Sequence, residues 1–190
     1  MKSTILAAAV TLAATGALAA PEKYVLDPSH SQVIFSYTHL GFSTTWGMFS
    51  GFEGEIMFDQ DAPADSSVTV SIPTMSMYTG WEKRFDHFMS DDFFGASEDD
   101  MVTFNSTGIE VTGDNTANIT GDLTVNGVTK SVVLDAELNK TGTHPMANKE
   151  WAGFSATTML KRSDFGLDKF APAVSDEVEV TLSIEAQKAE

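Results

Sequence analysis

Two alternating segments joined by Asn126-Gly127 constrain the fold of this chain more than any other feature. Asn-Gly supplies the two positive φ angles that a type I′ turn requires, so the segments are predicted to form a β-hairpin. The two-residue turn also sets the register, which places Val125 opposite Val128 and Ala117 opposite Ala136. Apolar side chains then share one face of the hairpin, so that face is predicted to lie on a core.

Residues 1–19 have the pattern of a secretory signal peptide and not of a folded element. Residues 5–18 form an Ala-rich apolar core, and Ala17-Leu18-Ala19 matches a small-x-small cleavage site. We expect cleavage near Ala19, which leaves residues 20–190 as a single domain with room for one hydrophobic core. The apolar core is too short to span a bilayer, so export without stable membrane insertion is predicted, most simply into a bacterial periplasm.

The composition narrows the classes of partner. The chain contains no cysteine, so it offers neither a disulfide nor a thiolate metal site. Without residues 1–19 it carries 10 basic and 27 acidic residues, which gives a formal net charge of −17. This charge disfavours nucleic acids and anionic membrane surfaces as partners.

Alternation with a period of two predicts eight strands in up-and-down order. They are expected at residues 32–40, 45–59, 68–72, 101–111, 117–125, 128–138, 151–160 and 178–186. A helical insert follows the third strand, because Trp81, Phe85 and Phe88 recur at the spacing of one helical face. Thr79 and Glu82 fit a capping box at the start of this helix.

The last predicted strand alternates as cleanly as any interior strand, which favours a neighbour on both of its edges. Closure against the first strand would supply the missing neighbour and remove the exposed edges. The predicted fold class is therefore all-β, an antiparallel eight-stranded barrel with a helical insert after the third strand. A two-sheet sandwich is the alternative.

Residue size leaves two kinds of barrel interior open. The predicted inward positions mix large aromatic residues with small ones such as Gly121, Ala136 and Ala156. Small residues can leave an elongated space for a ligand, or they can accommodate large residues opposite. The helix is likewise either a lid over one barrel mouth or an element packed outside the sheet. An apolar tunnel would suit a lipid tail, since each buried CH₂ contributes about 0.8 kcal/mol.

Short motifs run in order along the whole chain. They are Tyr24-Val25-Leu26-Asp27-Pro28-Ser29-His30-Ser31, His39-Leu40-Gly41, Gly47-Met48-Phe49, Asp92-Phe93-Phe94, Phe104-Asn105-Ser106-Thr107, Gly121-Asp122-Leu123-Thr124-Val125-Asn126-Gly127, Arg162-Ser163-Asp164-Phe165-Gly166 and Asp176-Glu177-Val178. In kind and order they resemble the YceI-like family of periplasmic polyisoprenoid-binding proteins. The resemblance implies a lipocalin-like barrel that holds an isoprenoid chain in an apolar pore. Phe85 departs from the family, which usually has an aspartate there.

The residues and the resemblance together predict a periplasmic carrier for an isoprenoid lipid, with a quinone or polyprenyl tail, and not an enzyme. No cofactor and no metal are expected. The predicted apolar pore comprises Phe35, Tyr37, Trp46, Met48, Phe52, Phe85, Phe88, Phe104 and Phe154. The predicted polar mouth comprises His39, Arg84 and His87.

Two other functions remain as alternatives. A barrel packed solid would act as an interaction or stress module without a ligand. A small hydrolase or metal protein would draw on Asp27, Ser29, His30, His39, Asp86 and His87. The chain lacks the Gly-x-Ser-x-Gly and His-Glu-x-x-His motifs of such enzymes. A filled interior would favour the first alternative, and two histidines within metal-ligand distance would favour the second. The sequence leaves a homodimer open.

Overall fold

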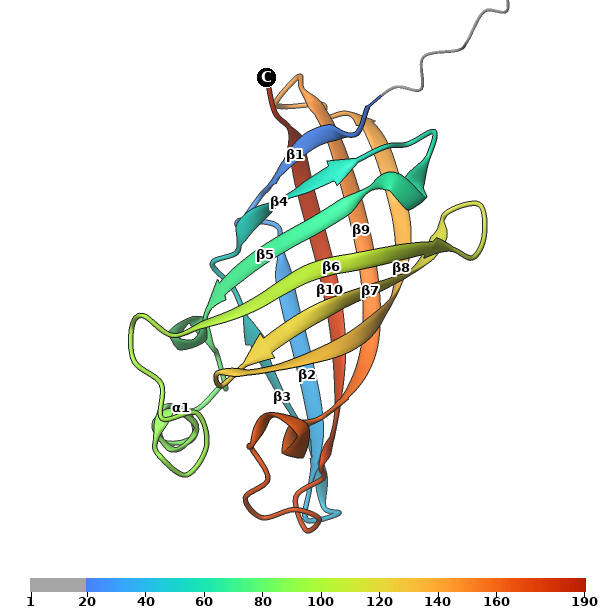
Figure 1. The fold of residues 1–190 in the computed structure, drawn as a ribbon. Coiled ribbons are helices and arrows are strands. Elements are labelled where there is room, and N and C mark those ends of the chain that lie inside the picture. The colour runs from blue at the N-terminus through green and yellow to red at the C-terminus, as the bar shows by residue number, and fades with distance from the viewer. Residues whose placement is uncertain (1–19) are drawn as a thin grey trace, which may run out of the picture.

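The computed structural model describes residues 20–190, so the predicted signal peptide lies outside the described residues. Figure 1 shows an antiparallel barrel with one short α-helix at one end. The strands are β1 (Glu22–Leu26), β2 (Gln32–His39), β3 (Ser43–Phe49), β4 (Glu53–Phe58), β5 (Ser67–Pro73), β6 (Met101–Val111), β7 (Thr116–Val125), β8 (Val128–Thr143), β9 (Glu150–Lys161) and β10 (Glu177–Lys188). The helix is α1 (Glu82–Met89), and the 3-10 turns are η1 (Pro63–Asp65), η2 (Thr74–Ser76) and η3 (Arg162–Phe165).

The ten strands occupy the eight predicted positions of the barrel. β1 and β2 together form one interrupted strand, and β3 and β4 together form another. Both β1 and β2 pair with β10, one along each half of its length. β1 also pairs with β4, so the ring from β4 through β10 closes without an edge. The prediction of a closed eight-stranded antiparallel barrel is confirmed. It missed β1, and the expected strand over residues 45–59 breaks near Gly51, whose φ is +71°.

The β7–β8 hairpin has the predicted turn and register. Asn126 and Gly127 take φ angles of 52° and 71°, as a type I′ turn requires. Val125 pairs with Val128, and Ala117 pairs with Ala136. The hairpin ends beside η3, where Asn126 Nδ2 donates to the Phe165 carbonyl oxygen at 3.2 Å. It therefore ties the sheet to the segment that follows β9.

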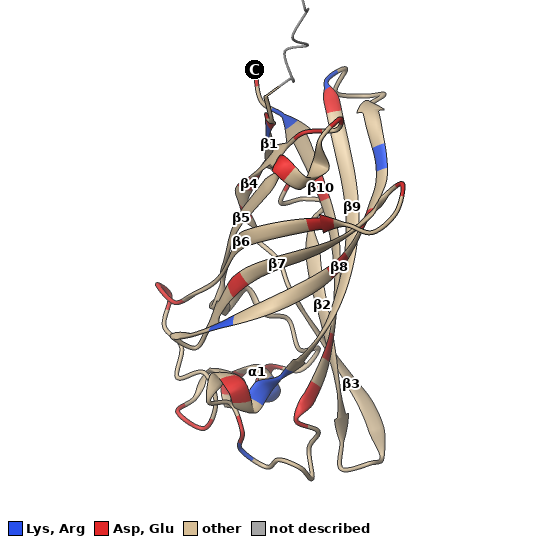
Figure 2. Ribbon diagram, turned by 45° about the vertical axis from the view of Figure 1, so that its right-hand side comes forward, with Lys and Arg blue, Asp and Glu red and all other residues tan. Residues whose placement is uncertain are grey.

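Helix α1 lies at the end of the barrel near the β7–β8 turn, as Figures 1 and 2 show. Its predicted capping box is wrong. The helix begins at Glu82 after an extended Trp81, and no side chain caps it. Gly80, with φ of +73°, turns the chain between Thr79 and the helix, and the Thr79 hydroxyl donates to the Trp81 carbonyl oxygen at 3.0 Å. The helix is held by the turn before it and by its packing.

The packed core lies beside β1 and β4. Tyr24 and Phe58 meet edge to face at 5.9 Å, and Phe58 meets Phe154 of β9 at 5.5 Å. Ala152 and Ala186 are buried on the neighbouring strands β9 and β10. Edge-to-face pairs of this kind contribute about 0.5–1.5 kcal/mol beyond area burial. Large side chains therefore fill this part of the barrel. Within residues 20–190, none of the helices has the length and hydropathy to cross a membrane.

Candidate ligand-binding cavity

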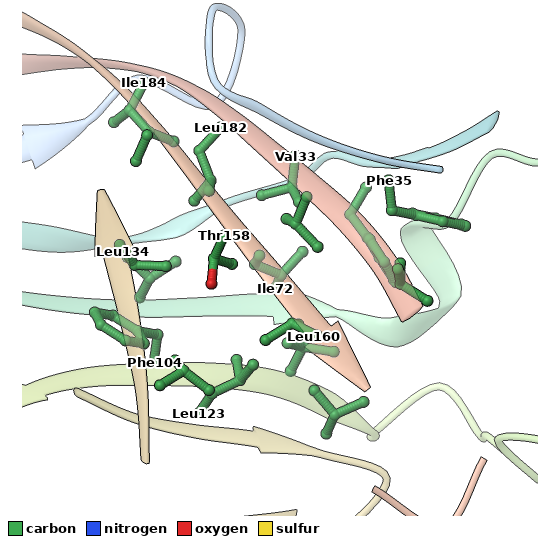
Figure 3. Close-up of a pocket in the computed structure, with 18 of the residues that line it drawn as sticks. Val33, Phe35, Ile72, Phe104, Leu123, Leu134, Thr158, Leu160, Leu182 and Ile184 are labelled. Carbon is green, nitrogen blue, oxygen red and sulfur yellow. The ribbon is translucent and has the colours of Figure 1, made fainter. Parts of the chain in front are cut away.

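A cavity of about 1260 Å³ occupies the interior of the barrel. Figure 3 shows side chains of β2 and of β5 to β10 pointing into it from all sides. Protein interiors hold few voids larger than a water molecule, so a space of this size indicates room for a ligand. It also exceeds the roughly 300–1,000 Å³ of usual small-molecule pockets. The alternative of a barrel packed solid is therefore wrong.

A row of alanines explains why the middle of the barrel is hollow. Ala136 of β8 pairs with Ala117 of β7 and with Ala156 of β9, and all three line the cavity. Gly121 serves a different purpose, because a Cβ there would lie 2.7 Å from the Asn105 carbonyl oxygen and closer still to the Phe104 ring. Both sequence interpretations of the small residues thus hold, at different positions.

The cavity reaches α1 at one end, where an aromatic and polar mouth forms. Arg84, His87 and Phe88 of α1 line it, so the helix acts as a partial lid and does not pack outside the sheet. The Phe88 ring lies 6.2 Å from that of Tyr37 on β2. His39, at the end of β2, also lines the cavity. All three residues of the polar mouth predicted from sequence therefore line it.

Charged side chains line the cavity near its ends, and its middle is apolar. Lys83, Arg84 and Arg162 lie at the α1 end, whereas Asp114 lies at the β6–β7 turn. The Arg84 guanidinium donates one hydrogen bond, of 2.8 Å, to the Thr79 carbonyl oxygen. Since a guanidinium has five N–H donors, Arg84 retains others for a ligand. Electron-rich oxygen atoms thus fit the α1 end better than the β6–β7 end.

His87 takes part in a contact that crosses the mouth. Its Nε2 lies 3.1 Å from Asp92 Oδ2, and Lys169 from the loop after η3 donates to the other oxygen of Asp92. Hydrogen bonds from Lys169 and His87 lower the pKa of the Asp92 carboxyl below its usual range. The rings of Phe93 and Phe170 stack at 6.2 Å beside this group. The α1 segment and the loop after η3 therefore close the mouth together.

Arg162 organises that loop, and its role was missed although it stands in a quoted family motif. Its guanidinium and Nε donate to the carbonyl oxygens of Lys169, Val174 and Ser175 at 2.8–2.9 Å, and also to that of Leu167. One side chain thus gathers a whole loop of backbone acceptors. The motif was the signal that could have identified it, but a run of five residues does not reveal which carbonyls converge.

Most residues of the predicted pore line the cavity. These are Phe35, Tyr37, Phe52, Phe88, Phe104 and Phe154, together with His39, Arg84 and His87 of the predicted mouth. Their roles in binding a ligand stay predictions. Three predicted pore residues do not reach the cavity, namely Trp46, Met48 and Phe85.

On β3 the predicted alternation of inward and outward residues is shifted by one position. Gly47 pairs with Phe35, whose ring points inward, so Thr45 and Phe49 share the inner face and Trp46 and Met48 face outward. Trp46 is 60% exposed as a result. Phe49 was the residue that did not fit the predicted alternation, and that misfit was the signal of the true phase.

The error at Phe85 concerns which side of α1 faces the cavity. Arg84, His87 and Phe88 turn toward the cavity, whereas Phe85 is half-buried on the adjacent side and outside the lining. Residues Phe93 and Phe170 take its expected place at the mouth. They lie on loops, where no period marks the inward residues.

A second polar cluster lies outside the cavity lining, at the turn between β1 and β2. His30 Nδ1 lies 2.6 Å from Asp27 Oδ2, and the Ser29 hydroxyl donates to Asp27 Oδ1 at 2.6 Å. Burial alone would raise the pKa of the Asp27 carboxyl, but hydrogen bonds from Ser29 and His30 lower it. The hydrogen bond to Asp27 raises the pKa of His30. Within residues 20–190, Asp27, His30 and Glu185 are the group that could meet a metal ion, and it has one histidine.

Comparisons with known proteins agree with this architecture. Residues 24–186 match the model of the YceI-like domain. A UPF0312 protein of Ectopseudomonas mendocina is 40% identical over 187 residues, which cover 97% of both chains. The crystal structure of BcnA from Burkholderia cenocepacia superposes with a TM-score of 0.76 at 26% identity, over 84% of this chain and 98% of that one.

A further solved structure shares the fold alone, at 16% identity. It is a polyisoprenoid binding domain from Saccharophagus degradans, with a TM-score of 0.67 over 87% of this chain and 98% of that one. The family match covers nearly all of the barrel, from β1 to β10. The chain therefore belongs to the YceI-like family.

Proposed function

We propose that this protein binds one isoprenoid lipid, with a quinone or polyprenyl tail, inside the barrel and carries or sequesters it. The observation that carries the proposal is the cavity of about 1260 Å³, which is apolar through its middle and polar at its ends. Membership of the YceI-like family supports it. So does the shared fold of a polyisoprenoid binding domain, although that likeness concerns the fold.

The apolar lining accounts for affinity toward a long chain. Each CH₂ that leaves water contributes about 0.8 kcal/mol, so ten buried carbons contribute roughly 8 kcal/mol before ordering costs. Branched isoprenoid units would fit beside the alanine row of Ala117, Ala136 and Ala156, whose small side chains line the cavity.

The headgroup belongs at the α1 end. His39, Arg84 and His87 offer N–H donors there to a carbonyl or hydroxyl oxygen, while Asp114 at the β6–β7 turn would repel electron-rich groups. The formal net charge of −16 favours a neutral headgroup over a phosphate. We expect the lipid to be held without chemical change, without a cofactor, and in the periplasm if residues 1–19 direct export.

Native mass spectrometry of the protein purified from its own cells, followed by solvent extraction, tests the proposal. We expect one isoprenoid per chain, recovered unmodified. Ala156→Phe should fill the cavity and strongly reduce occupancy. Its neighbour Thr157 is exposed on the opposite face of β9, so Thr157→Phe is the matched control and should retain the lipid. A native protein that takes up no quinone from detergent, or equal occupancy in both variants, would contradict the proposal.

A further inference from the structure

One region of this acidic chain carries no charge at all. Residues 28–52 contain no Asp, Glu, Lys or Arg, although 20% of the whole chain is charged. The region spans β2 and β3 and the turn between them. In Figure 2 this hairpin projects as the uncharged lower end of the molecule. This part of the surface therefore adds no acidic side chain to the repulsion between the protein and other negatively charged surfaces.

The turn of this hairpin and the loop after η3 form a composite apolar tip, defined here by Leu40, Phe42 and Phe170. Backbone hydrogen bonds join the two segments, from Leu40 N to the Ala173 carbonyl oxygen at 3.1 Å and from Ser175 N to the Thr38 carbonyl oxygen at 2.9 Å. At the tip, Leu40 is 50%, Phe42 89% and Phe170 51% exposed. Large apolar side chains that are exposed together mark an interaction site more often than scattered ones do.

The tip is continuous with the mouth of the cavity. Leu40 and Phe170 are half exposed at the tip and also line the cavity. A ligand that leaves past them would meet whatever the tip contacts before it meets bulk water. The tip thus joins the binding site to an external surface.

Amphipathic aromatic residues lie just behind the tip. Trp46 is exposed on the outer face of β3, Tyr78 is exposed where it bridges Met48, and Trp81 is exposed at the start of α1. Trp and Tyr prefer the boundary between water and a lipid bilayer, where one part of the ring is dry and the polar atom is wet. Trp46, four residues from Phe42 along the hairpin, is placed to reach such a boundary when the tip docks.

We propose that the apolar tip docks onto the surface of a phospholipid bilayer, so that the cavity mouth opens against the membrane. A second copy is disfavoured because each chain has a formal net charge of −16. The tip is also a narrow projection, as Figure 1 shows, whereas a stable protein interface buries about 800 Å² on each partner. The adjoining loop, residues 166–176, contains two acids and one base, Asp168, Asp176 and Lys169, so it adds a formal charge of only −1.

Docking gives the barrel a direct route for its ligand. An isoprenoid chain that crosses water must expose its apolar surface, and a mouth seated on the bilayer avoids that barrier. This transfer role rests on the proposed function, whereas the docking itself does not.

Flotation of the protein purified from its own cells with phosphatidylcholine vesicles tests the docking. Phe42→Ser should lower the fraction bound about tenfold, because one large apolar side chain leaves the bilayer. Met146→Ser is the matched control, since Met146 is 90% exposed in the β8–β9 turn at the other end of the barrel. Binding unchanged in Phe42→Ser, or lost equally in both variants, would overturn the proposal, as would a native protein that stays unbound.

The three tryptophans of the chain provide a second readout. Trp46 and Trp81 lie near the tip, whereas Trp151 lies at the start of β9, at the opposite end. In variants that keep a single tryptophan, brominated lipids should quench Trp46 and leave Trp151 unchanged. Equal quenching of both would overturn the proposal, as would a concentration-dependent dimer that Phe42→Ser abolishes.

Quinone binding in detergent separates the two proposals. Phe42→Ser should bind quinone in detergent as the native protein does and should take it up from vesicles about tenfold more slowly. If the native protein binds vesicles but binds no quinone in detergent, the proposed function is overturned and the docking stays supported. Uptake from vesicles at the native rate in Phe42→Ser would overturn the docking as the route of transfer.

Discussion

Gly47 on β3 lies directly against the inward-pointing ring of Phe35, its cross-strand partner on β2. A Cβ at Gly47 would come within 2.7 Å of Phe35 Cε1. Gly121 also lies against a ring, that of Phe104 on β6, although its cross-strand partner is Ser106, and a Cβ there would lie 2.7 Å from the Asn105 backbone oxygen. Glycine in these strands thus makes room for the rings that wall the cavity.

The two glycines should respond differently to substitution by alanine. In Gly47→Ala the added methyl group can push Phe35 into the cavity, so we expect the free energy of unfolding to fall by about 1 kcal/mol and the binding site to narrow. In Gly121→Ala the added methyl group meets the backbone, so we expect the free energy of unfolding to fall by nearer ~3 kcal/mol. Each kcal/mol lowers Tm by about 2–4 °C. Gly108→Ala is the control, because a Cβ there meets open space and its φ is not in the left-handed region. Equal Tm values for all three variants would contradict this account.

Arg162→Lys should loosen the loop after η3. An ammonium cannot reproduce the planar fork that reaches four carbonyl oxygens, and each hydrogen bond to a charged donor contributes about 1.5–3 kcal/mol. We expect faster amide hydrogen exchange at Val174 and Ser175, and a lower free energy of unfolding. Lys161→Arg, at the exposed neighbouring position, is the control and should leave the exchange rates unchanged.

The Asp27–His30 pair should make stability depend on pH. The folded pKa of Asp27 is lowered, so its contribution is present above its ordinary pKa and is lost as the pH falls through the lowered value. The folded pKa of His30 is raised, so its contribution is present below its ordinary pKa and is lost as the pH rises through the raised value. Both contributions are present together between pH 3.8 and 6.5, the ordinary pKa values of the two side chains.

A double-mutant cycle with Asp27→Asn and His30→Gln measures this coupling. We expect the coupling energy to be larger near about pH 5 than at a pH above the raised pKa of His30, where the imidazole has lost its proton. A coupling energy that stays constant across this range would show that the charge of His30 does not contribute.

Asp92→Asn should open the mouth without unfolding the barrel. The substitution removes the carboxylate that joins His87 to Lys169 across the mouth. Exposed ion pairs contribute little to stability, so Tm should change by no more than a few degrees. Exchange of a bound quinone for a labelled one, measured by stopped flow, should become faster. The exposed neighbour Asp91 offers the control Asp91→Asn, and equal exchange rates in both variants would contradict a role of Asp92 in closure.

The strand pattern was predictable wherever a strand runs without interruption. Along β7, β8 and β10 the alternation of apolar and polar residues identifies the inner face, and Asn126-Gly127 sets the register of the hairpin. The prediction failed at Trp46 and Met48 because β3 is separated from β4 by Gly51, so the phase of one strand does not carry over to the other. It failed at Thr79 because a left-handed Gly80 redirects the chain before α1.

The sequence by itself determined the closed barrel, since a period of two assigns faces and a well-patterned last strand demands a second neighbour. Only the tertiary structure decided that the interior is hollow. Cross-strand pairing aligns Ala117, Ala136 and Ala156 in one row, and that alignment depends on the registers of three strands together. The same holds for the mouth, where Asp92 follows α1 and both Arg162 and Phe170 lie in the connection between β9 and β10. Loop residues have no period, so long-range packing alone brings them to one place.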